Sequence, residues 1–172
     1  YVAEMVRQEM IARYGDDVLT KGYHVTTTID PALQTAAERA VVDGMRVYDH
    51  RHGWRKPAQQ VEIPDGADAK AIARLLRDTP AQGGLLPAVV TGSGNDGLQV
   101  VLADGSELTL GSSATSWTGK SGGALAQRGD VVRVRRSNMD KPDAAPTWVI
   151  DQLPRAQTAL VSLDADTGAL RA

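Results

Sequence analysis

The sequence predicts a mixed α+β fold, with helices and one strand in its first third and a small antiparallel barrel of five strands in its last half. Apolar residues recur at helical spacing near the amino terminus. Beyond Gly83-Gly84, short runs rich in β-branched residues are separated by turn residues. Because there is no Phe and aromatic residues make up only 4%, we expect small cores of Val, Leu, Ile and Ala.

Composition limits the classes of function. The 172 residues suffice for one ordinary domain or for two small pieces with modest cores. A formal net charge of -2 argues against the broad positive field of nucleic-acid binders, and the lack of cysteine excludes disulfides and thiolate chemistry. No apolar run approaches the length of a membrane span, and the start of the chain lacks a signal-peptide pattern. We expect any export signal of a parent protein to lie upstream.

The amino-terminal part contains two predicted helices and one predicted strand. Apolar residues spaced from Val2 to Tyr14 predict a helix that ends at Gly15. Residues 23–29 are β-branched and alternate, which predicts a strand. Asp30 and Pro31 suit the cap and the first position of a second helix, whose apolar face continues to Tyr48. The polar string that follows, from residue 50 to residue 60, predicts an ordered loop or linker.

The remaining chain is predicted to form a short helix and five strands. Residues 68–78 have one apolar helical face and end before Pro80. The strands are expected at residues 86–91, 98–102, 107–110, 131–135 and 148–153. Asn95-Asp96-Gly97 and Ala103-Asp104-Gly105 are good hairpin turns. Five short strands with a longer irregular stretch between the third and the fourth predict a closed or half-closed barrel of the OB type.

Four regions follow from these patterns. Residues 1–57 are expected to be a linker region of helix, strand and helix, and residues 58–84 a connecting segment with a short helix. Residues 85–155 are expected to be the OB-like domain. Residues 156–172, in which an apolar run precedes Asp164-Ala165-Asp166-Thr167-Gly168, are expected to be the opening hairpin of a further domain.

The tripeptide Gly119-Lys120-Ser121 imitates the end of a phosphate-binding loop. The leading glycine position of such a loop holds Ala114, no parallel βα unit surrounds the tripeptide, and Trp117 intrudes. A loop without nucleotide is therefore the favoured interpretation.

Two further tripeptides resemble elements of serine acyl-transferases of the penicillin-recognising class, which use S-x-x-K, S-x-N and K-T-G. They are Ser93-Gly94-Asn95 and Lys120-Ser121-Gly122. The S-x-x-K element is missing, because the residues three positions before the five lysines are Val18, Gly53, Ala67, Trp117 and Asn138. The sequence therefore predicts no catalytic, cofactor-binding or metal-binding residue in this chain.

Two basic patterns have competing interpretations. His50 and His52 flank Arg51, and alternating histidines can share a metal, but the arginine would repel a cation, so a solvated or phosphate-facing basic loop is favoured. Aromatic and basic side chains also suggest a groove for single-stranded nucleic acid, although the same alternation describes an ordinary half-buried strand. That set comprises Arg51, Trp54, Arg55, Lys56, Arg133, Arg135 and Arg136. The paired carboxylates Asp16-Asp17 and Asp164/Asp166 are read as turn residues.

Three segments resemble the class A penicillin-binding proteins, the bifunctional peptidoglycan synthases, in the Gram-negative type with an inserted OB-like domain. GYHVTTTIDPALQTAA, residues 22–37, is similar to the family's linker strand and helix. YDHRHGWR, residues 48–55, resembles the continuation seen in the inserted-domain type. ALVSLDADTGAL, residues 159–170, resembles the first hairpin of the transpeptidase domain. Together with the predicted barrel, the resemblance covers essentially the whole chain.

This resemblance implies a fragment that is not itself an enzyme, from a parent with peptidoglycan glycosyltransferase and D-Ala-D-Ala transpeptidase or carboxypeptidase activity. The parent would be anchored in the inner membrane, with this part in the periplasm. The implied partners are its own two catalytic domains and an outer-membrane lipoprotein activator or another periplasmic cell-wall protein, with no nucleic acid and no cofactor. Outside this family, the alternative is a stand-alone OB-type binding module for single-stranded nucleic acid or oligosaccharide.

Overall fold

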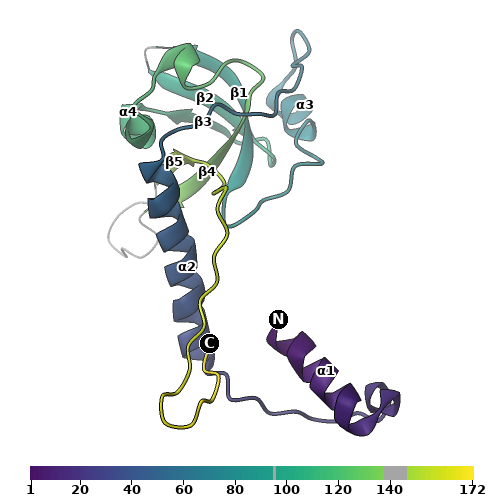
Figure 1. The fold of residues 1–172 in the computed structure, drawn as a ribbon. Helices are drawn as coiled ribbons and strands as arrows, with labels where there is room; N and C mark the ends of the chain where they lie inside the picture. Colours follow the sequence, from purple (N-terminus) through teal and green to yellow (C-terminus); the bar gives the residue numbers. More distant parts are fainter. Residues whose placement is uncertain (95, 138–146) are drawn as a thin grey trace. The chain divides into compact units, whose positions relative to one another are not determined.

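The computed structural model describes residues 1–94, 96–137 and 147–172, so the predicted turn residue Asn95 lies outside the described residues. The chain forms two compact units (Figure 1). One contains residues 1–39 together with 160–172, and the other contains residues 40–159. Helix α2, Pro31–Arg51, contributes residues to both units. No helix in the described parts is long and apolar enough to cross a membrane.

The first unit contains α1, Val2–Tyr14, and a short 3-10 helix, Asp16–Leu19. The predicted first helix is confirmed and ends where Gly15 takes a φ of 75°. The strand predicted for residues 23–29 is not formed. A strand requires a continuous ladder with a neighbour. Among the described residues, the hydrogen bonds here lie at the end of the segment, from the Thr28 hydroxyl to Leu170 O, and directly after it, from Asp30 N to Arg171 O.

The carboxyl-terminal residues of the same unit form a small hairpin. Leu163 and Leu170 pair in an isolated antiparallel bridge. Within the turn, Oδ1 of Asp164 accepts hydrogen bonds from the backbone N and the hydroxyl of Thr167, and Oδ2 accepts one from Arg171. The hydrogen bonds from Thr167 and Arg171 lower the pKa of Asp164 to about 2. Asp164 thus stabilises the local backbone of this turn, as its sequence context predicts.

The second unit is a curled five-stranded antiparallel sheet (Figure 1). Its spatial order is β3-β2-β1-β4-β5, and the strands are β1 Leu86–Gly94, β2 Gly97–Leu102, β3 Glu107–Leu110, β4 Val131–Ser137 and β5 Thr147–Asp151. All five predicted strands are confirmed, with ends that differ by a few residues. A β-bulge between Val90 and Gly92 interrupts the pairing of β1 with β2, and such a bulge increases local bending.

The main core fills the concave side of this sheet and consists of aliphatic side chains, as the composition predicts. Its largest fully buried members are Leu98, Leu110, Ile150, Val90, Val100, Val132 and Val134. The irregular stretch between β3 and β4 supplies three short helices, α4 Ser112–Thr115, η2 Ser116–Thr118 and η3 Gly122–Ala124. Ala114 and Leu125 from this stretch enter the same core.

A second, smaller core lies on the other face of β1, β2 and β4. Helix α3, Ala69–Arg74, begins at Asp68, whose carboxylate accepts a hydrogen bond from Ala71 N. Ile72 and Leu76 from this region are buried against Val89, Val101 and Val131. The predicted connecting segment therefore packs directly on the sheet (Figure 1).

The start of β2 depends on a glycine. Gly97 has a φ of 124°, and a Cβ added there would lie 2.2 Å from the carbonyl oxygen of Leu110. We expect Gly97→Ala to lower the free energy of unfolding by about 2–4 kcal/mol, because it adds backbone strain and a clash with β3. Urea denaturation of the whole chain measures this change.

Gly44→Ala is the matched control. Gly44 lies inside α2 with open space around it, so alanine is expected to stabilise the helix by about 0.5–1 kcal/mol. Equal effects of the two substitutions would contradict this explanation of Gly97.

Candidate functional site

The carboxyl-terminal end of α2 is joined to β5 by a buried cluster of charged and amide side chains, named here the α2–β5 junction: Arg46, Asp49, His50, Arg55, Arg135, Asp151 and Gln152. The side chain of Asp151 is 1% exposed. Its Oδ2 accepts a hydrogen bond of 2.7 Å from Arg135 Nε and lies 3.2 Å from Arg46 Nε. Its Oδ1 lies 2.8 Å from His50 Nε2. A buried carboxylate needs such partners, because the desolvation of an unpaired charge is costly.

Asp49 is the second buried carboxylate of the junction. Arg55 binds it through two parallel hydrogen bonds, from Nη1 to Oδ1 at 2.8 Å and from Nη2 to Oδ2 at 2.9 Å. Gln152 donates a third hydrogen bond to Oδ2. Burial by itself raises the pKa of Asp49, but the hydrogen bonds from Arg55 and Gln152 and the charge of Arg55 outweigh it and hold the pKa below its ordinary value.

Aromatic side chains pack between the α2–β5 junction and the main core. The His50 ring stacks on Trp117 with 3.6 Å between ring centroids, and Trp117 meets Trp54 edge to face. Each indole N–H is satisfied, since Trp54 Nε1 donates to Leu125 O and Trp117 Nε1 donates to Ile150 O. Two of the three tryptophans are thus held in position by both packing and hydrogen bonding.

The junction corrects the prediction of a solvated or phosphate-facing basic loop at His50 and His52. Helix α2 continues to Arg51, so both histidines lie in its last turn or directly after it. His50 is half-buried against Asp151, while His52 Nδ1 lies 2.9 Å from the carbonyl oxygen of Tyr48. In the described parts of the chain, no three potential metal ligands come together.

The candidate nucleic-acid groove is not assembled as the sequence pattern suggested. Arg55 and Arg135 are paired with the buried carboxylates, and Trp54 packs in the main core. Arg133 donates to Pro80 O at 2.7 Å, and the Arg136 guanidinium lies over the Trp148 ring. Most of the residues proposed for the groove therefore stabilise the domain itself.

The motif fragments that resemble acyl-transferase elements lie at one end of the barrel. Ser93, Gly94, Lys120 and Ser121 line the same recess of about 580 Å³, while Asn95, Asn138 and Lys141 lie outside the described residues. Among the described contacts, no side-chain hydrogen bond joins a serine of this recess to Lys120. Gly119 adopts a φ of 60° after η2, and the three-residue helix η3 follows, so the tripeptide is a turn between two short helices.

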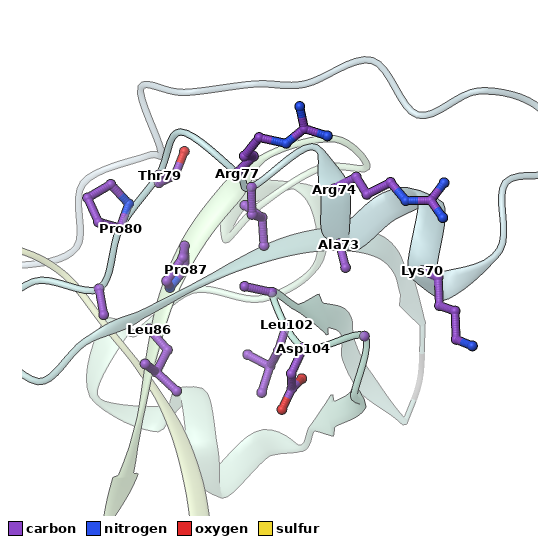
Figure 2. Close-up of a pocket in the computed structure, with 14 residues that line it drawn as sticks. Lys70, Ala73, Arg74, Arg77, Thr79, Pro80, Leu86, Pro87, Leu102 and Asp104 are labelled. Atoms are coloured by element: carbon purple, nitrogen blue, oxygen red, sulfur yellow. The ribbon is translucent and has the colours of Figure 1, made fainter.

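A second recess, which was not predicted from the sequence, lies between α3 and the sheet (Figure 2). It has a volume of about 830 Å³ and is named here the α3 recess. Figure 2 shows Lys70, Arg74 and Arg77 extending from α3 and the turn after it, with Leu86 and Leu102 on the sheet side. The four-residue spacing of Lys70 and Arg74 places them on one face of α3, and Arg77 follows in the turn after the helix. This spacing of basic residues was the signal available in the sequence.

The wall of the α3 recess formed by residues 79–81 is fixed by side chains from outside it. Arg133 donates to Pro80 O, and Gln59 Nε2 donates to the Thr79 hydroxyl at 2.9 Å. Burial lowers the pKa of Arg133, which remains a cation at neutral pH. The recess is therefore bounded by held backbone on one side and by α3 on the other.

The curled five-stranded antiparallel sheet with its covering helices defines an OB-like domain. Residues 54–156 match the family model described as the penicillin-binding protein OB-like domain. The chain belongs to this family and is an OB-like region of a class A penicillin-binding protein.

Curated relatives are similar in sequence to this chain over nearly its whole length. Penicillin-binding protein 1A of Pseudomonas aeruginosa is 38% identical over 99% of this chain, and the proteins of the same name from Haemophilus influenzae and Escherichia coli are 37% and 34% identical over 100% of it. The chain spans about a fifth of the length of these relatives (21%, 20% and 21%). The crystal structure of penicillin-binding protein 1A from Haemophilus influenzae matches with a TM-score of 0.80 and 35% identity, over 99% of this chain and 25% of that one.

The α2–β5 junction predicts a large effect of neutralising Asp151. We expect Asp151→Asn to lower the free energy of unfolding by about 2–4 kcal/mol, because Arg46 and Arg135 lose their buried counter-charge. Urea denaturation measures this value. Asp43→Asn is the control, since Asp43 pairs with the same Arg46 but is 69% exposed, and a change within about 0.5 kcal/mol is expected. Equal losses in both variants would contradict the role assigned to Asp151.

Asp49 predicts a component of acid sensitivity. Its pKa is lower in the folded than in the unfolded chain, where the ordinary value is 3.8, so protons bind preferentially to the unfolded state as the pH falls. The contribution of Asp49 is therefore complete above about pH 5 and is lost as the pH falls through the lowered folded-state value. In urea titrations across the acid range, Asp49→Asn should show a shallower pH dependence than the wild type. Parallel curves would rule this contribution out.

Proposed function

We propose that this chain is the non-catalytic linker and docking region of a bifunctional penicillin-binding protein that polymerises and cross-links peptidoglycan. The observation that carries the proposal is the amount of apolar surface that its first unit leaves uncovered. Helix α1 has no buried residue, and Met5, Tyr14 and Tyr23 are among its unit's exposed large apolar side chains. Monomeric proteins rarely leave contiguous apolar surface of this kind without a partner.

A groove in the first unit supports the same proposal. Its volume is about 660 Å³, and it lies between α1 and residues 25–29, with Val6, Met10 and Ile29 in its lining. Residues 23–29 also have no sheet neighbour among the described residues, although their β-branched sequence suits a strand. We propose that the catalytic domains of the parent, above all its transpeptidase, cover these residues and the exposed side of α2.

The second unit supports a docking role without chemistry of its own. In the part of the chain that the structure describes, the buried carboxylates Asp49 and Asp151 are each held by partly buried basic side chains of the α2–β5 junction. Among the described residues at the barrel end, no side-chain hydrogen bond joins a serine hydroxyl to Lys120, as activation of a nucleophile by this lysine would require. A rigid module of this kind suits the binding of a periplasmic regulator, such as an outer-membrane lipoprotein activator. In this proposal the parent is anchored in the inner membrane and this region lies in the periplasm.

The test uses Leu33, which is 46% exposed on α2. In the parent protein, Leu33→Asp should lower the rate of peptide cross-linking by several-fold, because a charge enters the surface proposed to pack against the transpeptidase. Glycan polymerisation and peptide cross-linking are measured separately on lipid-linked precursor.

Thr35→Asp is the matched control. It adds the same charge two residues later, on the opposite side of the helix, and is expected to leave cross-linking near the wild-type rate. The proposal fails if Leu33→Asp and Thr35→Asp have the same rate as the wild type, or if both lower it equally.

A further inference from the structure

We propose that the α3 recess binds an extended acidic segment of a partner protein, in which an apolar side chain lies between carboxylates. This inference rests on the proposed docking function and names the chemistry of the docked segment. It is carried by the combination of unpaired cations, an apolar floor and a fixed wall in one recess (Figure 2).

The charges of the recess are available to a ligand. Lys70, Arg74 and Arg77 are exposed, and none of them forms an ion pair with a carboxylate of the described residues. The arginines of the α2–β5 junction, in contrast, are all paired with buried carboxylates. Since the whole chain has a net charge of -2, these three cations form a local positive surface on a slightly acidic protein. Such a surface attracts and orients a negatively charged partner.

The floor of the α3 recess is apolar, so a ligand that fits it carries an apolar side chain in addition to its negative charges. Leu86 is 37% exposed at the start of β1, and it lies beside Pro87 and Leu102 from the sheet. An apolar side chain of the ligand would cover this floor and gain from the removal of its surface from water. No aromatic residue lines the recess, so the stacking platforms that bind single-stranded nucleic acid are missing there.

A fourth charge restricts the ligand further. Asp104 lies at the edge of the recess, and its Oδ1 accepts a hydrogen bond from Ser106 N. The hydrogen bonds from Ser106 keep the pKa of Asp104 below its ordinary value, so it is ionised at neutral pH. This carboxylate disfavours a densely charged polyanion and can accept a hydrogen bond from a peptide N–H, which favours a peptide with spaced carboxylates.

The wall of the recess is prepared for binding before a ligand arrives. Arg133 and Gln59 hold residues 79 and 80, and Gln82 and Leu85 exchange two backbone hydrogen bonds in the following turn. A site that is already ordered loses little conformational entropy when a ligand binds. The recess therefore suits an extended segment that lies along α3 and the first residues of β1.

The test measures binding of a fluorescein-labelled peptide, in which Leu alternates with pairs of Glu, to the whole chain by fluorescence anisotropy. A peptide with Gln in place of Glu and an all-Glu peptide should each bind more weakly than the Leu-Glu peptide, and added salt should weaken Leu-Glu binding. The triple variant K70E/R74E/R77E should weaken it by about tenfold or more. Leu86→Ser should weaken it by several-fold while the salt dependence is retained.

The matched control is R51E/K56E/K120E, which makes the same change in net charge at exposed cations outside the recess. It should bind the Leu-Glu peptide as the wild type does, and thermal unfolding checks that all variants are folded. Equal loss in the two triple variants, no binding of the Leu-Glu peptide by the wild type, or equal binding of a single-stranded oligothymidylate in the recess would each overturn the inference.

The same variants separate this inference from the proposed function. If Leu33→Asp lowers cross-linking but the peptide does not bind, the linker proposal stands and the inference about the recess fails. If the peptide binds as expected but Leu33→Asp has no effect, the recess stands and the linker proposal fails.

Discussion

The buried carboxylate of Asp151 is the constraint on which the second unit depends. A charge at 1% exposure is tolerated only when donors surround it, and here they come from α2, β4 and the adjoining backbone. The need for those donors fixes the rotation of the last turns of α2 and the position of the end of β5. The same requirement brings His50 onto Trp117 and thereby joins the helix to the main core.

The elements that the sequence predicted correctly are those whose formation is local. The five strands follow from short β-branched runs between turn residues. Helix α2 is capped by Asp30, whose Oδ1 accepts hydrogen bonds from Ala32 N and Leu33 N. Residues 23–29 have the same local preference, but a strand also needs a partner for its backbone. Among the described residues, the hydrogen bonds to this segment lie only at its carboxyl-terminal end. The strand prediction for residues 23–29 was wrong because local sequence preference does not report whether a neighbouring strand is present.

The site was harder to predict, because its contacts join residues far apart in the sequence. Arg55 and Arg135 look like free surface cations until the fold brings Asp49 and Asp151 against them. The role of residues 58–84 was partly visible, however. Ala88, Val89 and Val90 are consecutive apolar residues of β1, and such a run indicates a strand buried on both faces. Helix α3 provides the second cover, which agrees with a family match that begins at Trp54.

The basic side chains of this domain fall into two groups, those paired with buried carboxylates and those exposed at the α3 recess. The arginines of the α2–β5 junction form ion pairs with buried carboxylates in the folded chain. Removing the arginine or the carboxylate of such a pair would leave the other charge in a poorly solvated position. The basic side chains of the α3 recess are exposed, so replacing them is expected to change the free energy of unfolding little. The contribution of these three exposed cations, from α3 and the turn after it, to the stability of the fold is therefore small. The proposed binding role gives these charges a function, because a cluster of cations attracts and orients a partner of opposite sign.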